Sequence, residues 1–172
     1  MIRKFTLAFL LVSLVALLVQ AHEFWMQPDK FVYQVGEVAK INFMVGENFV
    51  GERWKVNAQR FLRFDHHAGS YSEGLIEQLN TGEGNNLEVK LAKEGSHLFA
   101  MQSTNAFIEL EADKFNDYLK EDGLEDILAF RQKNNQMEKP AKEYYARCTK
   151  LLLKAGAKSD DTYKKVIGLP LE

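Results

Sequence analysis

The chain has 172 residues, a formal net charge of −2 and a single cysteine. Its length suits one domain with a substantial core, or one domain plus a small appendage. The mild acidic balance gives no basic footprint for a nucleic acid, and one cysteine excludes an intrachain disulfide framework.

Residues 1–21 have the features of a secretory signal peptide. A short basic start precedes an almost wholly apolar run over 5–19, and Val19 and Ala21 are small residues three before and one before a cleavage site. The run is short for a permanent membrane span, which needs about 20 apolar residues. We therefore expect cleavage after Ala21, export to the periplasm or the medium, and a mature chain that begins at His22 and has no membrane span.

The first half of the mature chain has the pattern of short β-strands. Apolar and polar side chains alternate over 37–45, and 59–65 is rich in Phe and Leu. The turn sequence at 82–86 introduces a second alternating run over 87–91. A short corner, Lys93-Glu94-Gly95, followed by a further strand occupies 93–101.

This corner is typical of an immunoglobulin-like sandwich, in which a tyrosine commonly sits two residues after the glycine. His97 takes that place here. Several short strands separated by turns, without intervening helices, favour a sandwich over a parallel sheet. We therefore predict a mainly β fold, an immunoglobulin-like antiparallel β-sandwich.

The second half changes to helical spacing. A first helix is expected around 115–119 with Gly123 as its C-terminal cap, and a second over 124–131. Pro140 suits the first turn of a third helix that runs through Tyr144 and Tyr145. The sequence thus predicts a C-terminal helical insertion of two to three short helices over about 112–147.

The leucine-rich stretch 148–154 fits two interpretations. It is either a returning strand with one apolar face or a continuation of the preceding helix, and we favour the strand. With this strand, residues 22–172 are expected to form a single sandwich domain that carries the helical segment.

Six segments in order resemble those of a known family: residues 22–28 (His-Glu-Phe-Trp-Met-Gln-Pro), 45–52, 107–115, 118–124, 145–150 and 168–172. The family consists of exported bacterial proteins that contain a domain of unknown function and are assigned to the periplasmic part of nickel or cobalt uptake. The resemblance implies a periplasmic metal-binding protein with a membrane metal-transport system as partner. Members usually continue beyond Gly-Leu-Pro-Leu-Glu into a further β-rich segment, so we expect a C-terminally short member.

The four histidines are the candidate metal ligands. A mature N-terminal His22 could chelate one ion through its amine, which titrates near pH 8, and its ring Nδ1. Imidazole nitrogen suits divalent Ni, Co and Cu, so the expected site joins His22 with one of His66 and His67 and with His97. Adjacent residues of a strand point to opposite faces, so only one of His66 and His67 would join the metal site.

Each histidine also has a plainer interpretation. His22 could be an ordinary first residue of an edge strand, and His66 and His67 a polar turn after a strand. His97 could be a corner residue that bonds the backbone in place of tyrosine.

Sequence signatures of catalysis are missing. The chain has no Gly-x-Ser-x-Gly elbow, phosphate loop, Gly-x-Gly-x-x-Gly or His-Glu-x-x-His. Phe24 stands where the amino-terminal copper and nickel motif needs a histidine. We expect a non-catalytic periplasmic protein that binds and delivers nickel or cobalt. The alternatives are a copper-dependent oxidoreductase with a histidine brace at His22, and a structural or interaction sandwich without metal.

Overall fold

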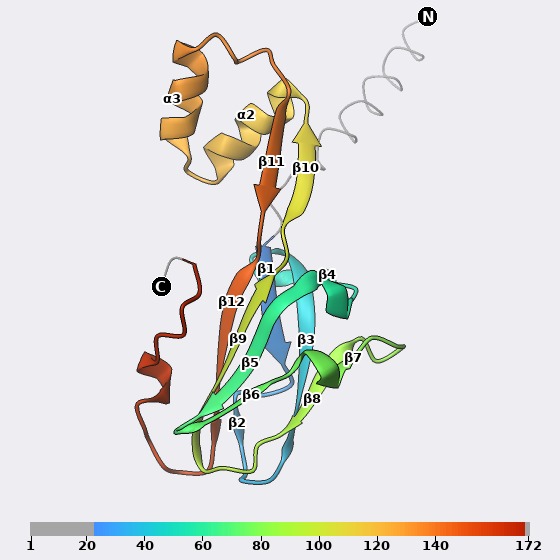
Figure 1. The fold of residues 1–172 in the computed structure, drawn as a ribbon, viewed down its shortest axis with the longest axis vertical. Coiled ribbons are helices and arrows are strands. Elements are labelled where there is room, and N and C mark those ends of the chain that lie inside the picture. The colour runs from blue at the N-terminus through green and yellow to red at the C-terminus, as the bar shows by residue number, and fades with distance from the viewer. Residues whose placement is uncertain (1–22, 171–172) are drawn as a thin grey trace, which may run out of the picture. The chain divides into compact units, whose positions relative to one another are not determined.

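The structure, a computed structural model, describes residues 23–170 (Figure 1). These fall into two compact units, a β-sandwich of Glu23–Ala106 and Tyr144 onward, and an inserted helical unit of 107–143. The expected signal peptide and His22 lie outside the described residues. Within 23–170 no helix is long and apolar enough to cross a membrane.

The first sheet of the sandwich is antiparallel and has β1 at its edge. Its order is β1-β3-β8-β7, and β4 pairs with the far end of β3 as a hairpin. The strands are β1 (Glu23–Pro28), β3 (Val38–Glu47), β4 (Val50–Arg53), β7 (Leu79–Asn80) and β8 (Asn86–Lys90). The alternation predicted at 37–45 and 87–91 is confirmed in β3 and β8.

The second sheet has the order β2-β12-β9-β5-β6. The pairing of β2 with β12 is parallel, and the other pairings are antiparallel. The strands are β2 (Val32–Tyr33), β5 (Phe61–Ala68), β6 (Tyr71–Gly74), β9 (Gly95–Ser103) and β12 (Cys148–Ala155). The loops of the described chain also contain the short 3-10 helices η1 (Ala58–Arg60), η2 (Ile76–Gln78) and η3 (Thr162–Lys164).

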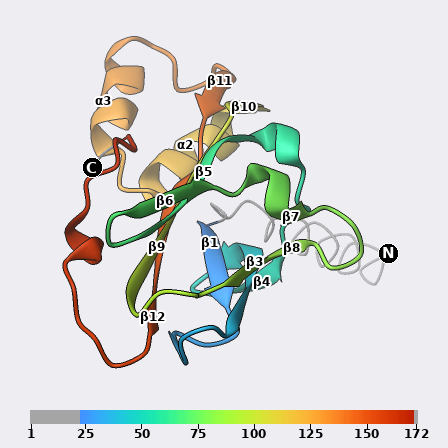
Figure 2. The same cartoon turned by 60° about the horizontal axis from the view of Figure 1, so that its bottom comes forward.

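The two sheets face each other across one hydrophobic core (Figure 2). Ala39, Ile41 and Phe43 on the inner face of β3 are fully buried, whereas the intervening side chains are more exposed. The Phe43 ring lies at the centre of an aromatic cluster, 5.5 Å from the ring of Phe61 and 5.7 Å from that of Phe64. The prediction of a mainly β sandwich is confirmed.

The helical unit is built on a two-stranded sheet of β10 (Ala106–Leu110) and β11 (Ala141–Tyr145), between which lie α2 (Ala112–Glu121) and α3 (Glu125–Lys133). Gly123 follows α2 with a φ of 68°, as its predicted capping role requires. The buried Arg131 stabilises the unit, because its guanidinium donates hydrogen bonds to the Asn116 side chain of α2 and to the carbonyls of Gln136 and Lys139 in the loop after α3.

Two of the predicted helices are confirmed, and the third is wrong. Residues 141–145 form β11 instead of a helix, and burial alternates along it as it does along β10. This period of two follows from pairing with a strand about 30 residues away, which local spacing does not reveal. The returning strand predicted at 148–154 is confirmed as β12.

The segment after β12 crosses the outer face of the second sheet. The guanidinium of Arg63 donates to the carbonyl of Ile167, and the backbone N–H of Gly69 donates to the Thr162 hydroxyl at 3.1 Å. This tail covers side chains of β5 that point away from the core.

Candidate functional site

Both central histidines lie inside β5, so the alternative that they form a turn beyond a strand is wrong. The strand continues to Ala68 and returns through a tight turn into β6. Because neighbouring strand residues point to opposite faces, His66 joins Phe64 on the inner face and His67 points outward.

The structure brings His66 and His97 together inside the sandwich. His66 pairs in register with Phe99 of β9, and His97 lies two residues before Phe99 on the same face. His66 Nε2 is 2.7 Å from His97 Nδ1, and the His66 ring stacks on Phe99 with 4.6 Å between centroids. The two histidines are 2% and 1% exposed, so their contact is shielded from water.

The outer ring nitrogen of His97 is held by the backbone. Nε2 lies 2.9 Å from the carbonyl oxygen of Lys93, which can only accept, so this nitrogen carries the proton. The bond is the one expected of a corner residue that replaces tyrosine. It leaves Nδ1, the atom that faces His66, without a proton in the neutral ring.

The outer ring nitrogen of His66 is held by Glu73, its cross-strand neighbour on β6. Nδ1 lies 3.0 Å from Glu73 Oε1. Partial burial raises the pKa of Glu73, but hydrogen bonds from His66, Tyr71 and Gln78 outweigh it and hold the pKa below its ordinary value. Glu73 is therefore an ionised acceptor, and His66 Nδ1 carries the proton of the neutral ring.

The positions of the ring protons determine what the His66–His97 pair can bind. Two neutral imidazoles carry two N–H groups, and both point outward, to Lys93 and to Glu73. The facing nitrogens are then two lone pairs 2.7 Å apart, which repel each other unless a cation lies between them. Burial, with smaller opposing effects, lowers the pKa of both rings, so the proton is a poorly stabilised occupant at neutral pH.

The donors suit a transition metal as that cation. Metal-binding histidines usually donate their second N–H to a carboxylate or a carbonyl, as His66 and His97 do. Two metal–nitrogen bonds of about 2.0–2.1 Å at 90–110° require nitrogens about 2.8–3.4 Å apart, whereas the two nitrogens are 2.7 Å apart here. Residues 23–170 contain no group of three or more His, Cys, Asp or Glu that could hold a metal, so the pair supplies two ligands.

His67 belongs to a different environment. It lies under the C-terminal tail and is 5% exposed, and neither of its ring nitrogens has a hydrogen-bond partner within the described chain. Burial lowers its pKa, and the positive charge of nearby Lys165 lowers it further. The side chain is a buried neutral imidazole on the face opposite to the pair.

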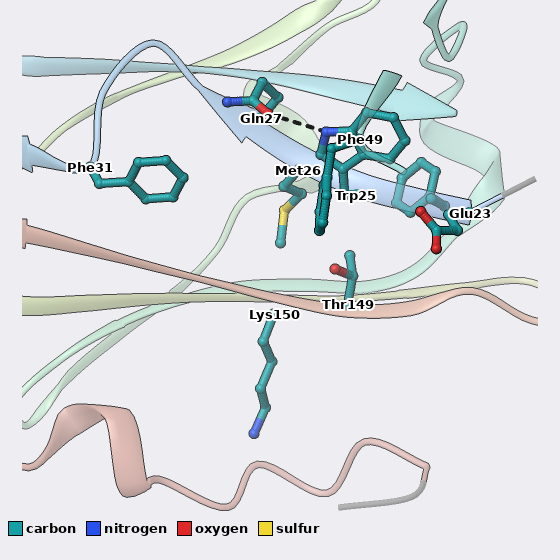
Figure 3. A pocket seen from close by; sticks show the side chains of 9 residues that line it. Glu23, Trp25, Met26, Gln27, Phe31, Phe49, Thr149 and Lys150 are labelled. Carbon is teal, nitrogen blue, oxygen red and sulfur yellow. Dashed lines mark hydrogen bonds between the residues drawn. The ribbon is translucent and has the colours of Figure 1, made fainter. Parts of the chain in front are cut away.

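The start of β1 lies apart from the pair along the sandwich. Trp25 faces Thr149 of β12 across a groove (Figure 3). His66 pairs with Phe99 of β9, and Phe99 pairs with Leu151 of β12, so the histidine pair lies at the level of Leu151, two residues after Thr149. Glu23, two residues before Trp25, is thus about four residues or about 13 Å from that level at 3.3 Å per residue. The beginning of β1 and the histidine pair are two separate places.

Sequence reasoning missed the residues that orient the pair. Glu73, the Lys93 carbonyl and the stacked ring of Phe99 were not candidates. A usable signal was present, because a strand extended through Ala68 and a turn at Gly69 place Glu73 directly opposite His66.

Comparison with known proteins places the chain in a family. A family model described as a domain of unknown function (DUF4198) matches residues 19–172, and the chain belongs to that family. No curated protein and no solved structure matches it.

Proposed function

We propose that this member of the DUF4198 family is an exported protein that binds nickel or cobalt in the periplasm and passes it to a membrane transport system, without catalysis. The observation that carries the proposal is the His66–His97 pair, in which two lone pairs face each other while both outer N–H groups are anchored. Such a pair favours a cation of the class that imidazole prefers.

The pair has the properties of a binding site for cargo more than of a reactive centre. It is enclosed, and Tyr71 lies edge-on to His66 with 6.0 Å between ring centroids. Lys93 Nζ lies 4.6 Å from the Tyr71 ring centroid. An ion would enter by displacing the partly exposed side chain of Tyr71.

Export would add a second ligand set. Cleavage after Ala21 exposes the amine of His22, which with its own ring forms a two-nitrogen chelate. Glu23, the first residue of β1, would be the second residue of the processed chain. Recovery from the periplasmic fraction of a protein whose N-terminal sequence starts at His22 would support export and processing; recovery of the uncleaved chain would contradict it.

The decisive experiment is metal titration of the mature protein that starts at His22. Ni²⁺ and Co²⁺ binding is measured by calorimetry, and Co²⁺ absorption bands report nitrogen coordination. We expect His66→Gln and His97→Gln each to weaken binding at the interior site at least tenfold, because each removes one of two ligands. His22→Ala should remove a separate binding event.

His67→Gln is the matched control, since His67 is equally buried on the opposite face of the same strand. It should leave the interior site unchanged. Near-ultraviolet circular dichroism confirms that each variant is folded. Binding that is absent, or that survives in the double variant of His66 and His97, would overturn the proposal for the pair.

A further inference from the structure

The inserted helical unit carries the excess negative charge of the chain after Ala21. Residues 107–143 contain ten acidic and six basic residues, a net charge of −4. The rest of residues 23–172, which belongs to the sandwich, contains 14 acidic and 14 basic residues and is neutral. Because the charge excess is confined to one unit, that unit has its own electrostatic preference for a partner.

Helix α3 of this unit leaves large apolar side chains in contact with water. Leu124, the residue before the helix, is 39% exposed, and Ile127 and Phe130 are 48% and 59% exposed. Residues three apart are neighbours on a helix surface, so these side chains form one row, the α3 stripe. At 1.5 Å per residue the α3 stripe is about 9 Å long, or nearly two turns.

Other residues hold α3 in the unit. Arg131 is the buried side chain of α3, and its Nε donates to the Asn116 side chain of α2 at 2.9 Å. Its guanidinium carbon also lies 4.9 Å from the centre of the Phe115 ring. A helix of nine residues needs tertiary contacts to be stable in water, and these contacts supply them. The exposed part of the α3 stripe is therefore not needed to hold the helix.

Four carboxylates lie at the N-terminal end of the α3 stripe. Glu121 and Asp122 end α2, and Glu125 and Asp126 begin α3. All four residues are exposed, and within residues 23–170 none of them forms a salt bridge. The helix dipole favours the two acids that begin α3 but opposes the two that end α2. Helix capping therefore does not account for the whole acidic cluster.

The α3 stripe and its acidic rim together indicate the chemistry of a partner. Adjacent exposed apolar side chains with a polar rim mark sites of protein interaction. Apolar residues three apart on one helix pack against a second helix whose apolar residues recur at similar spacing. Unpaired carboxylates beside them favour lysine or arginine on that second helix.

Two other occupants fit the charge poorly. A second copy of this chain would bring together two helical units that each have a net charge of −4, and like charges across an interface cost affinity. A membrane surface with anionic headgroups attracts basic segments, so it repels an acidic unit.

We propose that the helical unit binds a basic amphipathic helix of a partner protein. The apolar face of that helix covers the α3 stripe, and its lysine or arginine side chains pair with the four carboxylates Glu121, Asp122, Glu125 and Asp126. A surface of this size suits a transient complex, since stable interfaces bury about 800 Å² on each partner.

The probe is the peptide acetyl-Ala-Lys-Leu-Ala-Lys-Leu-Leu-Lys-Ala-Leu-Lys-Ala-Lys-Leu-amide, whose leucines fall on one face of a helix. One control peptide has the same composition with the leucines spread around the helix, and another has glutamate in place of every lysine. NMR titration of the mature protein, with a chelator present, measures binding. We expect the probe to bind at least tenfold more tightly than either control and to shift the amide resonances of residues 121–131.

Three variants test the geometry. Ile127→Ser and Phe130→Ser each remove an apolar side chain of the α3 stripe and should weaken the probe at least fivefold. The double variant Glu125→Gln with Asp126→Asn removes two carboxylates. It should weaken the probe at least threefold and reduce the salt dependence of binding, because salt screens exposed charges.

Matched control positions lie on the sandwich. Val50 is an apolar residue that is 78% exposed, and Glu83 is an exposed acidic residue. Val50→Ser and Glu83→Gln should leave the affinity for the probe unchanged. Circular dichroism and thermal unfolding confirm that each variant is folded. If one variant of the α3 stripe fails to fold, the other one and the carboxylate double variant still decide.

Several results would overturn the inference. They are no binding of the probe, equal binding of the probe and a control peptide, or binding that shifts resonances of the sandwich only. Binding that survives both Ile127→Ser and Phe130→Ser would also do so. Self-association that Phe130→Ser abolishes would identify a second copy as the occupant, and binding to anionic vesicles would identify a membrane. Because the chelator removes metal, the result is independent of the proposed metal function.

Discussion

The three buried histidines of β5 and β9 should make the protein lose stability in mild acid. His66, His67 and His97 are at most 5% exposed, and burial lowers the pKa of each below 6.5. Below pH 6.5 the unfolded chain therefore binds more protons than the folded chain. The histidine contribution to stability is present above pH 6.5 and is lost as the pH falls below it.

The number of these histidines sets the largest possible slope of the free energy of unfolding against pH. Each histidine that is charged when unfolded and neutral when folded costs about 1.4 kcal/mol per pH unit, so three cost up to about 4 kcal/mol per unit. This is large against a total stability of about 5–15 kcal/mol. Carboxylates whose pKa is lowered, including Glu73 and Asp160, whose pKa is about 2, lose their contribution only below about pH 4.5.

Urea unfolding at pH 7.5, 6.5, 5.8 and 5.2, followed by tryptophan fluorescence in the presence of a chelator, measures this slope. The free energy of unfolding should fall steadily below pH 6.5. His67→Leu should remove about a third of the slope, because one of three groups no longer titrates. A stability that stays constant from pH 7.5 to 5.2 would refute the reasoning, since it would mean that the histidines titrate alike in both states.

Three further predictions concern the core, a turn and access to the pair. Phe43→Ala should cost about 3–5 kcal/mol of unfolding free energy, because the ring is fully buried at the centre of the aromatic cluster; a loss below about 1 kcal/mol would contradict that role. Gly95→Ala should lower the melting temperature more than Gly69→Ala. Both glycines have positive φ, but a Cβ at Gly95 would lie 2.0 Å from Asp160 Oδ2, and a Cβ at Gly69 meets nothing within 4 Å. Tyr71→Ala should speed Co²⁺ uptake in stopped-flow absorbance, and an unchanged rate would show that ions enter elsewhere.

The strands that carry their own pattern could be predicted, and those defined by a distant partner could not. β3 alternates clearly because one face is buried in the core and the other meets water. β11 has the same alternation of burial, but Tyr144 and Tyr145 after Pro140 suit a helix equally well. Only the pairing with β10, across both helices, selects the strand, and that pairing is a non-local contact that single-sequence spacing does not encode.

The histidine pair shows the same limit for function. Histidine chemistry marked His66 and His97 as candidates, but their contact depends on the register between β5 and β9, which are about 30 residues apart. Register also decides which of two adjacent histidines faces the core, because a slip of one residue exchanges their faces. Had β5 been shifted by one, His67 would face the core and Glu73 would no longer lie opposite the inner histidine. The tautomers that turn two lone pairs toward each other are therefore a product of the folded sheet, and composition alone could only nominate the residues.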